Sequence, residues 1–260
     1  MPQPPSPLDL LRSLDEGTRR EAFDRISVEM NGELARGILG LIASDAPDEV
    51  RADAIVSLGP AVEECGVEYM EDEEDGELPS ADWIPLSREA FEEVTSALRA
   101  VYEDPAQPTI VRRRAMEVLV RDPRPWMTDA IRRDFASEDR DWKMTAIFSM
   151  GFVRGFQQEL LDTLRSADGD LLYEAVRAAG NAEVQKAAPI LEAFALSDET
   201  DRDVRLEAIA ALPSVDRECF DLLDELADSS DEEVRAAAEE ALEELQMFGE
   251  DLDDEEEEEE

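Results

Sequence analysis

Apolar and polar residues follow one pattern repeatedly along most of the chain, and the segment from Ser230 to Leu245 shows it most plainly. Ser230 and Glu233 have the spacing of a capping box, in which each side chain accepts a hydrogen bond from the other residue's backbone amide. Val234, Ala238 and Leu242 then lie one above another on a single helical face. The pattern predicts a helix that begins near residue 230 and buries one stripe of side chains.

The same pattern recurs at a nearly constant spacing. Consecutive alanines at the equivalent position are separated by 32, 61, 31, 29, 33 and 30 residues: Ala22, Ala54, Ala115, Ala146, Ala175, Ala208 and Ala238. A second amphipathic segment precedes each of these helices, at 8–14, 34–42, 91–101, 126–135, 160–164, 190–196 and 220–226. Such periods are typical of stacked helix pairs, and the doubled interval fits one period plus an insertion. We therefore predict an all-α, right-handed α-solenoid of about seven helix pairs, with alanines where helices approach closely.

Several copies carry Val-Arg at the start of the stripe, as in Val50-Arg51 and Val204-Arg205. The full arrangement, an apolar helix followed by Asp/Ser-x-x-x-Val-Arg-x-x-Ala-x-x-x-Leu, resembles HEAT repeats of the short type found in phycobilisome lyases. The resemblance covers about residues 7–246. It implies that the Val-Arg helices line a concave face, and it implies little about activity because this fold serves scaffolds, adaptors and a few enzymes.

The repeats define the expected organisation of the chain. Residues 1–7 form a proline-rich lead without structure, residues 8–246 form the solenoid, and residues 247–260 form a disordered acidic tail. Within the solenoid, residues 60–86 interrupt the period, and the centre of this insertion, residues 71–77, contains no apolar side chain. We expect a mobile acidic loop there.

Charge is the most unusual property of the composition. The chain has 68 acidic and 25 basic residues, for a net charge of −43. Repulsion of this size strains a compact state at low salt, whereas the Debye length falls from about 10 Å at 0.1 M to about 3 Å at 1 M salt. We expect a halophilic protein, and the alternative is a merely acidic protein that prefers arginine. With no apolar run of membrane-spanning length and no signal peptide, we expect a cytoplasmic monomer that does not bind membranes.

The residues needed for common catalytic sites are missing. The chain has no histidine, which excludes Ser-His-Asp triads, Cys-His pairs, histidine-based zinc sites and the His-Glu iron sites of some HEAT-fold hydroxylases. The segment 151–155 lacks the residues of a phosphate-binding loop. Cys65 and Cys219 stand far apart in different repeats and are expected to be reduced packing residues. We expect no catalytic residue, no metal site and no cofactor.

One segment is locally positive. Residues 108–133 carry seven arginines against three acidic residues, and aromatic residues follow directly. Arg113 and Arg114 point away from the apolar stripe, so we expect both to be exposed, with Arg121 and Arg124 nearby. We predict that these four arginines bind a partner protein's acidic segment or the chain's own tail. The alternative is that Arg112 is a structural arginine of the repeat and the others balance neighbouring acidic residues.

Two classes of function follow. The first is a non-catalytic scaffold or adaptor, not an enzyme, that binds a protein partner through the concave face. The second is a HEAT-fold enzyme or cofactor-handling protein, similar to a bilin lyase or a DNA-base glycosylase. An acidic mimic of nucleic acid or a chaperone is a further alternative. We expect no nucleic-acid binding, because a glycosylase requires a basic groove for phosphates.

Overall fold

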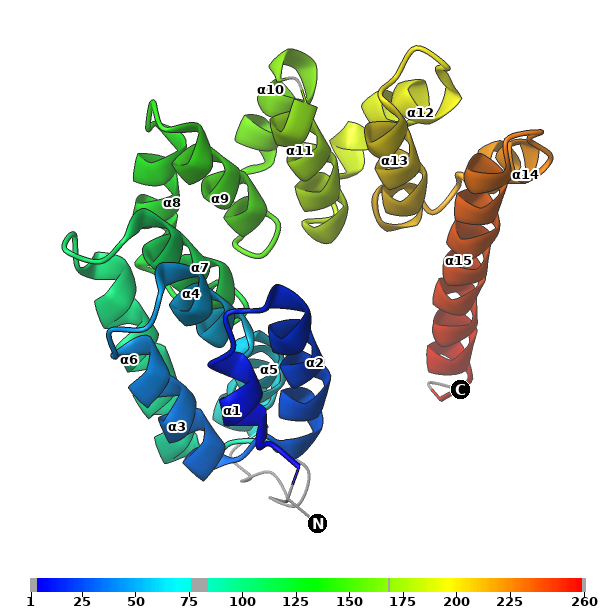
Figure 1. Ribbon diagram of the computed structural model, residues 1–260. Coiled ribbons are helices and arrows are strands. Elements are labelled where there is room, and N and C mark those ends of the chain that lie inside the picture. The colour runs from blue at the N-terminus through cyan, green and yellow to red at the C-terminus, as the bar shows by residue number, and fades with distance from the viewer. Residues whose placement is uncertain (1–3, 76–83, 168, 259–260) are drawn as a thin grey trace. The chain divides into compact units, whose positions relative to one another are not determined.

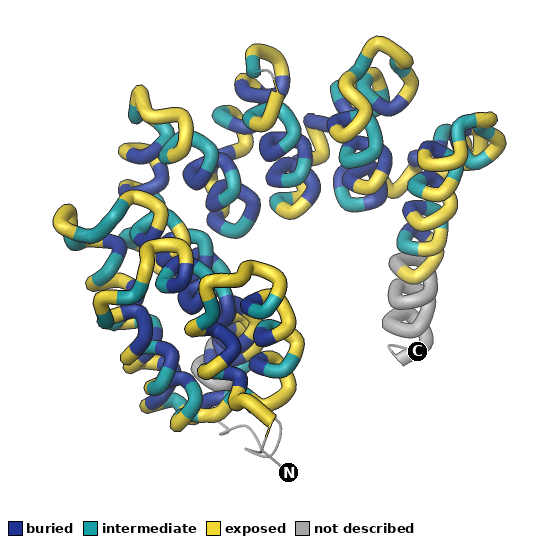
Figure 2. The backbone as a smooth tube through the Cα atoms, viewed as in Figure 1, coloured by how far each residue is buried: buried dark blue, intermediate teal, exposed yellow. Residues whose placement is uncertain are grey.

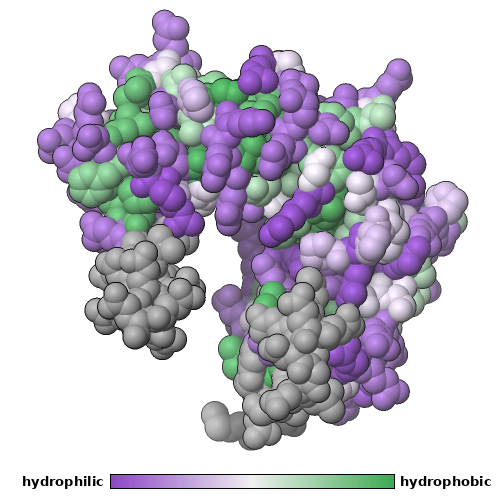
Figure 3. Space-filling model, turned by 180° about the vertical axis from the view of Figure 1, so that it is seen from behind, coloured by the Kyte–Doolittle hydropathy of each residue, from purple (hydrophilic) through white to green (hydrophobic). Residues whose placement is uncertain are grey.

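The computed structural model describes residues 4–75, 84–167 and 169–258 of the 260-residue chain. All secondary structure in these residues is helical, which confirms the predicted all-α fold (Figure 1). The helices form two compact units, Met1–Met127 and Thr128–Glu260. Hydrophilic residues cover most of the described surface on the face shown in Figure 3, with apolar side chains visible between them.

The first unit contains three helix pairs and one additional helix. Its helices are α1 (Pro7–Leu11), α2 (Glu16–Glu29), α3 (Gly32–Ile42), α4 (Asp48–Val56), α5 (Gly59–Asp75), α6 (Arg88–Glu103) and α7 (Thr109–Leu119). The pairs are α1 with α2, α3 with α4 and α6 with α7, and α4 packs directly against α7. The second helices of the second and third pairs therefore stack on each other, as expected for a repeat protein.

The second unit continues the alternation of first and second helices. Its helices are α8 (Met127–Phe135), α9 (Arg140–Met150), α10 (Gln157–Ser166), α11 (Gly169–Asn181), the 3-10 helix η1 (Gln185–Ala187), α12 (Ala188–Leu196), α13 (Arg202–Val215), α14 (Phe220–Ala227) and α15 (Glu232–Glu258). Helices α9, α11, α13 and α15 pack successively against one another, and each of the last three also packs against the helix before it in its pair. Seven pairs result over the described residues.

The alanines that define the repeat lie in the core. Each of them is at most 1% exposed: Ala22, Ala54, Ala115, Ala146, Ala175, Ala208 and Ala238. Buried positions recur on the facing sides of the stacked helices, and exposed positions lie on the connections and outer sides (Figure 2). The small side chain permits close packing between helices, so the predicted stripe is confirmed.

The arginine of the Val-Arg pair has a structural role. Arg51, Arg112 and Arg205 each donate from Nε to a backbone carbonyl at the end of the preceding helix, at 2.7, 2.9 and 2.8 Å. The last carbonyls of a helix have no partner within the helix, and a nearby cation also complements the helix dipole. The arginine therefore joins the two helices of its pair, as the alternative interpretation of Arg112 proposed.

The mobile acidic loop that we expected at residues 71–77 is not a loop over residues 71–75. Helix α5 continues from Gly59 to Asp75, and residues 76–83 lie outside the described residues. Ala61, Val62, Cys65 and Tyr69 have helical spacing and are buried, and the Tyr69 hydroxyl donates to the Leu86 carbonyl at 2.6 Å. This apolar stripe is sufficient to hold the helix against α6, although an acidic run follows it in the sequence.

The two ends of the chain also differ from expectation. Helix α1 begins at Pro7, and Ser6 and Asp9 form a capping box, so the lead ends before residue 6; residues 1–3 lie outside the described residues. Helix α15 continues to Glu258, where we expected a disordered tail from residue 247; residues 259–260 are not described. Propagation of an existing helix costs far less than nucleation, and glutamate is a good helix former.

Candidate binding surfaces

Arg113 and Arg114 of α7 are paired with the same carboxylate. Glu117 lies 4.0 Å from Arg113 Nη2 and also forms an ion pair with Arg114. The Arg113 side chain is only 16% exposed, so the expectation that it is exposed is wrong, whereas Arg114 is 44% exposed. Glu117 lies three and four residues further along the helix on the same face, where it holds both guanidinium groups against α7. An acidic partner at this pair stays a prediction.

Arg121 and Arg124 have different surroundings. Arg121, 28% exposed, forms an ion pair with Glu63 of α5. Arg124 donates from Nε to Asp122 Oδ2 at 2.8 Å, and the Asp122 side chain is 3% exposed. The four predicted arginines therefore pair with three different carboxylates, Glu117, Glu63 and Asp122. The structure does not bring them together on one exposed surface.

Arg124 instead lines two cavities, one with Arg88 and one with Arg99, and neither of these arginines was predicted to belong to a site. A cavity of about 340 Å³ is lined by Arg88, Arg124, Tyr69, Phe91, Glu92, Thr95 and Ser96. A second cavity of about 140 Å³ is lined by Arg99, Arg124, Thr95, Ser96, Leu119, Asp122, Trp126 and Met127. The two cavities share Arg124, Thr95 and Ser96 and are therefore neighbours along α6; together they are called the α6 cleft. Arg88, Ser96 and Arg99 have the spacing of one helical face, which is the signal that could have identified it.

Aromatic rings orient two of these arginines. The Arg88 guanidinium carbon lies 4.5 Å from the centre of the Tyr69 ring, and that of Arg99 lies 4.6 Å from the centre of the Trp126 ring. Arg99 Nε also donates to Glu103 at 2.8 Å. Stacking of a guanidinium on an aromatic face restricts its side-chain rotamers while its edge can still donate hydrogen bonds.

A larger groove lies in the second unit. Its volume is about 580 Å³, and its lining comes from α11, α13, α15 and the turns before them: Gly169, Asp170, Tyr173, Asp201, Asp203, Val204, Leu206, Glu207, Ala210, Ala237 and Glu240. This acidic groove contains five carboxylates, whereas lysine and arginine are absent from its described lining. Tyr173 and Leu206 occupy the same position of the repeat as Arg113.

The polar groups of the acidic groove interact with one another. The Tyr173 hydroxyl forms a hydrogen bond with the Glu207 carboxylate, and this bond, with burial as a smaller cause, raises the pKa of Tyr173. Leu206 and Ala237 supply apolar surface between the carboxylates. The groove therefore offers both apolar contact and negative charge.

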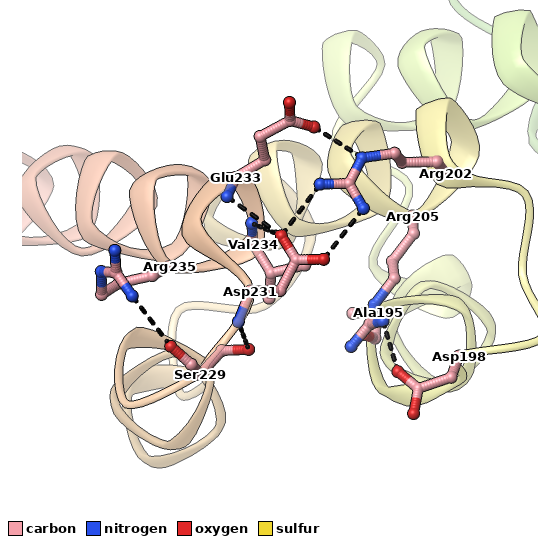
Figure 4. Close-up of polar contacts among 9 residues, drawn as sticks. All are labelled: Ala195, Asp198, Arg202, Arg205, Ser229, Asp231, Glu233, Val234 and Arg235. Carbon is pink, nitrogen blue, oxygen red and sulfur yellow. Dashed lines mark hydrogen bonds and ion pairs between the residues drawn. The ribbon is translucent and has the colours of Figure 1, made fainter.

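An arginine bridge holds α13 to α15 beside the groove. Arg202 Nη1 and Nη2 each bind Asp231 at 2.9 Å, and Arg202 Nε binds Glu233 at 2.5 Å (Figure 4). Asp231 Oδ1 also accepts from the amides of Glu233 and Val234, so Asp231 caps α15 and the predicted capping box at Ser230 is wrong. The bonds from Arg202 hold the pKa of Asp231 well below its usual value.

The two cysteines are packing residues, as expected. Cys65 and Cys219 are both buried and free. Burial raises the pKa of each thiol to about 11. At neutral pH both are therefore protonated, and a thiol in this state is a poor nucleophile and metal ligand.

Part of the second unit matches a known family of repeats. Residues 157–243 match HEAT repeats. The matched segment runs from the start of α10 into α15, so it includes the whole acidic groove. The predicted HEAT-repeat character is confirmed over these residues, and the lyase-like subtype and the halophilic origin stay predictions. No curated protein matches the sequence.

One solved structure with a similar arrangement is an enzyme. The structure of human deoxyhypusine hydroxylase in complex with glycerol matches with a TM-score of 0.38 and 15% sequence identity, over 93% of this chain and 95% of that chain. This finding overturns our prediction that the chain is not an enzyme. A similarity of this degree assigns neither an activity nor a ligand to the chain. None of the helices that the structure describes combines the length and apolarity needed to cross a membrane.

Proposed function

We propose that this protein is an adaptor that binds an extended, basic segment of another protein in the acidic groove. The observation that carries the proposal is the groove itself, which opens along the second helices of three successive HEAT repeats. Stacked repeats create extended surfaces of this kind, and a peptide chain can lie along them.

The chemistry of the lining favours a basic segment. The apolar side chain of Leu206 and the small side chain of Ala237 suit the aliphatic stem of lysine or arginine. Asp203, Glu207 and Glu240 then lie where the cationic head of such a side chain can reach a carboxylate. Charge complementarity of this kind determines specificity and association rate more than affinity.

The test must separate the groove from the general negative charge of the protein. A fluorescently labelled, unstructured peptide of alternating lysine and serine serves as the probe, and its glutamate-serine counterpart is the negative control. Binding is measured by fluorescence anisotropy at constant salt. Two variants on α15 form a matched pair: Ala237→Arg introduces a long cation into the groove, and Ala236→Arg places the same charge at an exposed position outside it.

We expect Ala237→Arg to weaken binding by about tenfold or more and Ala236→Arg by less than about twofold. Glu240→Gln and Glu239→Gln extend the comparison, because both residues are exposed and only Glu240 lines the groove. Circular dichroism verifies that each variant retains its helices. Equal losses in the paired variants mean that the peptide senses only overall charge, and the proposal is then wrong.

A further inference from the structure

The α6 cleft is lined by residues of the first unit and contains three arginines. The acidic groove is lined by residues of the second unit, and the charged residues in its described lining are all acidic. Arg88, Arg99 and Arg124 converge on the α6 cleft from α6 and from the connection between α7 and α8. The opposing charges in the lining are Glu92 and Asp122. A cavity with more cationic than anionic side chains is unusual in a chain with a net charge of −43.

In Arg99 and Arg124, the Nε–H group and the terminal N–H groups serve different acceptors. The ion pairs of Arg99 and Arg124 use Nε, towards Glu103 and Asp122 respectively. A guanidinium has five N–H donors, so these pairs leave the terminal nitrogens of both side chains for another acceptor. The buried Asp122 carboxylate fixes Arg124, and the Trp126 ring orients Arg99, which reduces the entropy lost when a ligand binds.

The lining also contains two hydroxyl groups. The Thr95 hydroxyl donates its proton to the Phe91 carbonyl at 3.0 Å, so it is not a donor to the cleft. Ser96 is exposed on α6 and lines both cavities, so it adds a donor beside Arg124. The terminal nitrogens of Arg99 and Arg124 and the Ser96 hydroxyl supply more donors than a carboxylate can accept, and they suit the three terminal oxygens of a phosphate group. Arg88 adds positive charge to the lining.

We propose that the α6 cleft binds a phosphate monoester. The cavity of about 340 Å³ between Arg88 and Arg124 has room for the phosphate together with part of the group that carries it. Arg99 extends the positive surface into the smaller cavity. The phosphate belongs either to a small metabolite or to a phosphorylated serine of a protein.

Calorimetric titration of the full chain with O-phosphoserine and with a peptide that contains phosphoserine tests the site. Arg88→Gln and Arg99→Gln each remove one cation from the cleft. Arg20→Gln is the matched control, because Arg20 forms an ion pair with Glu16 at 2.6 Å with the same four-residue spacing as Arg99 and Glu103, but on α2. Ser96→Ala is a milder variant that changes no charge and leaves the helix intact.

We expect both cleft variants to weaken binding of O-phosphoserine by about tenfold or more, Ser96→Ala by about threefold, and Arg20→Gln by less than about twofold. Equal affinity for the amino acid and the peptide indicates a small phosphorylated metabolite as the ligand, and tighter binding of the peptide indicates a phosphorylated protein. The proposal is overturned if the native chain shows no binding up to about 10 mM, or if the cleft variants behave like the control. Equal binding of a peptide with glutamate in place of phosphoserine overturns the preference for phosphate.

Discussion

Replacement of Gly180 by alanine tests the close approach of α11 and α13. An ideal Cβ at Gly180 lies 2.9 Å from the Cβ of Ala211 and 3.4 Å from its Cα. Neither atom belongs to a flexible side chain, so the added methyl group can be accommodated only if the helices separate. Overpacking of a core typically costs about 1–3 kcal/mol.

A gain in helix propensity opposes this cost. Alanine is favoured over glycine by about 0.8–1.0 kcal/mol in a helix interior. For Gly180→Ala, these opposing contributions give a net loss of stability of up to about 2 kcal/mol. Gly40 is the matched control, because it also lies near the end of its helix and an added Cβ there meets nothing within 4 Å. Gly40→Ala should therefore stabilise the protein by up to about 1 kcal/mol.

Replacement of Gly37 by alanine tests a contact of the same length with a flexible side chain in place of a rigid one. The added Cβ would also lie 2.9 Å from another atom, but that atom is Cδ2 at the end of the Leu8 side chain. Rotation of Leu8 relieves the contact, so Gly37→Ala should be close to neutral. Thermal melts of the three variants at one salt concentration give the order Gly40→Ala, Gly37→Ala, Gly180→Ala, from most to least stable, with shifts of about 2–4 °C per kcal/mol. A Gly180 variant that melts above the native protein would refute the assigned helix packing.

Two further predictions concern charge. Because the net charge is −43, the melting temperature should rise between about 0.1 M and 2 M potassium chloride; a constant melting temperature would contradict both this prediction and the expected halophilic adaptation. The bonds from Arg202 and the α15 amides lower the pKa of Asp231 in the folded protein, so the pair stabilises the fold above the unfolded pKa of Asp231 and loses this effect as the pH falls below about 4. Asp231→Asn should therefore lower the melting temperature at neutral pH by more than at pH about 3, and an equal difference at both pH values would exclude this linkage.

The repeated stripe was predictable because its information is local. A helix brings residues three and four apart onto one face, so Val204, Ala208 and Leu212 identify a buried face without knowledge of the neighbouring helix. In the insertion, in contrast, the local run of acidic residues predicted a loop where the chain continues a helix. Residues 71–77 contain no apolar side chain, yet α5 continues through residues 71–75, and its earlier part is held by the buried Cys65 and Tyr69. The apolar stripe, and not the acidic run, determines where α5 packs.

The binding surfaces were less predictable because each depends on residues distant in sequence. Arg121 has Glu63 as its partner, 58 residues away, and no local pattern links the two. The carboxylates of the acidic groove come from α11, α13, α15 and the residue before α13. Acidic residues are so common in this chain that no sequence pattern distinguishes these five from the others. Only the stacking of successive repeats brings Glu207 and Glu240 to one groove.

The segment richest in arginine does not coincide with the cavities that arginines line. In an acidic chain, a run of arginines indicates where the fold must neutralise nearby carboxylates, and Glu117 accordingly binds both Arg113 and Arg114. Arg88 and Arg99 stand apart in the sequence among acidic neighbours, yet both line a cavity with Arg124 because α6 passes beside the connection after α7. Arg99 and Arg124 bind their carboxylates through Nε and keep terminal nitrogens beside a cavity, whereas Arg113 and Arg114 contact Glu117 through their terminal nitrogens. The proposed phosphate site therefore lies where arginines from separate segments line neighbouring cavities, and only Arg124 of the basic run at residues 108–133 belongs to it.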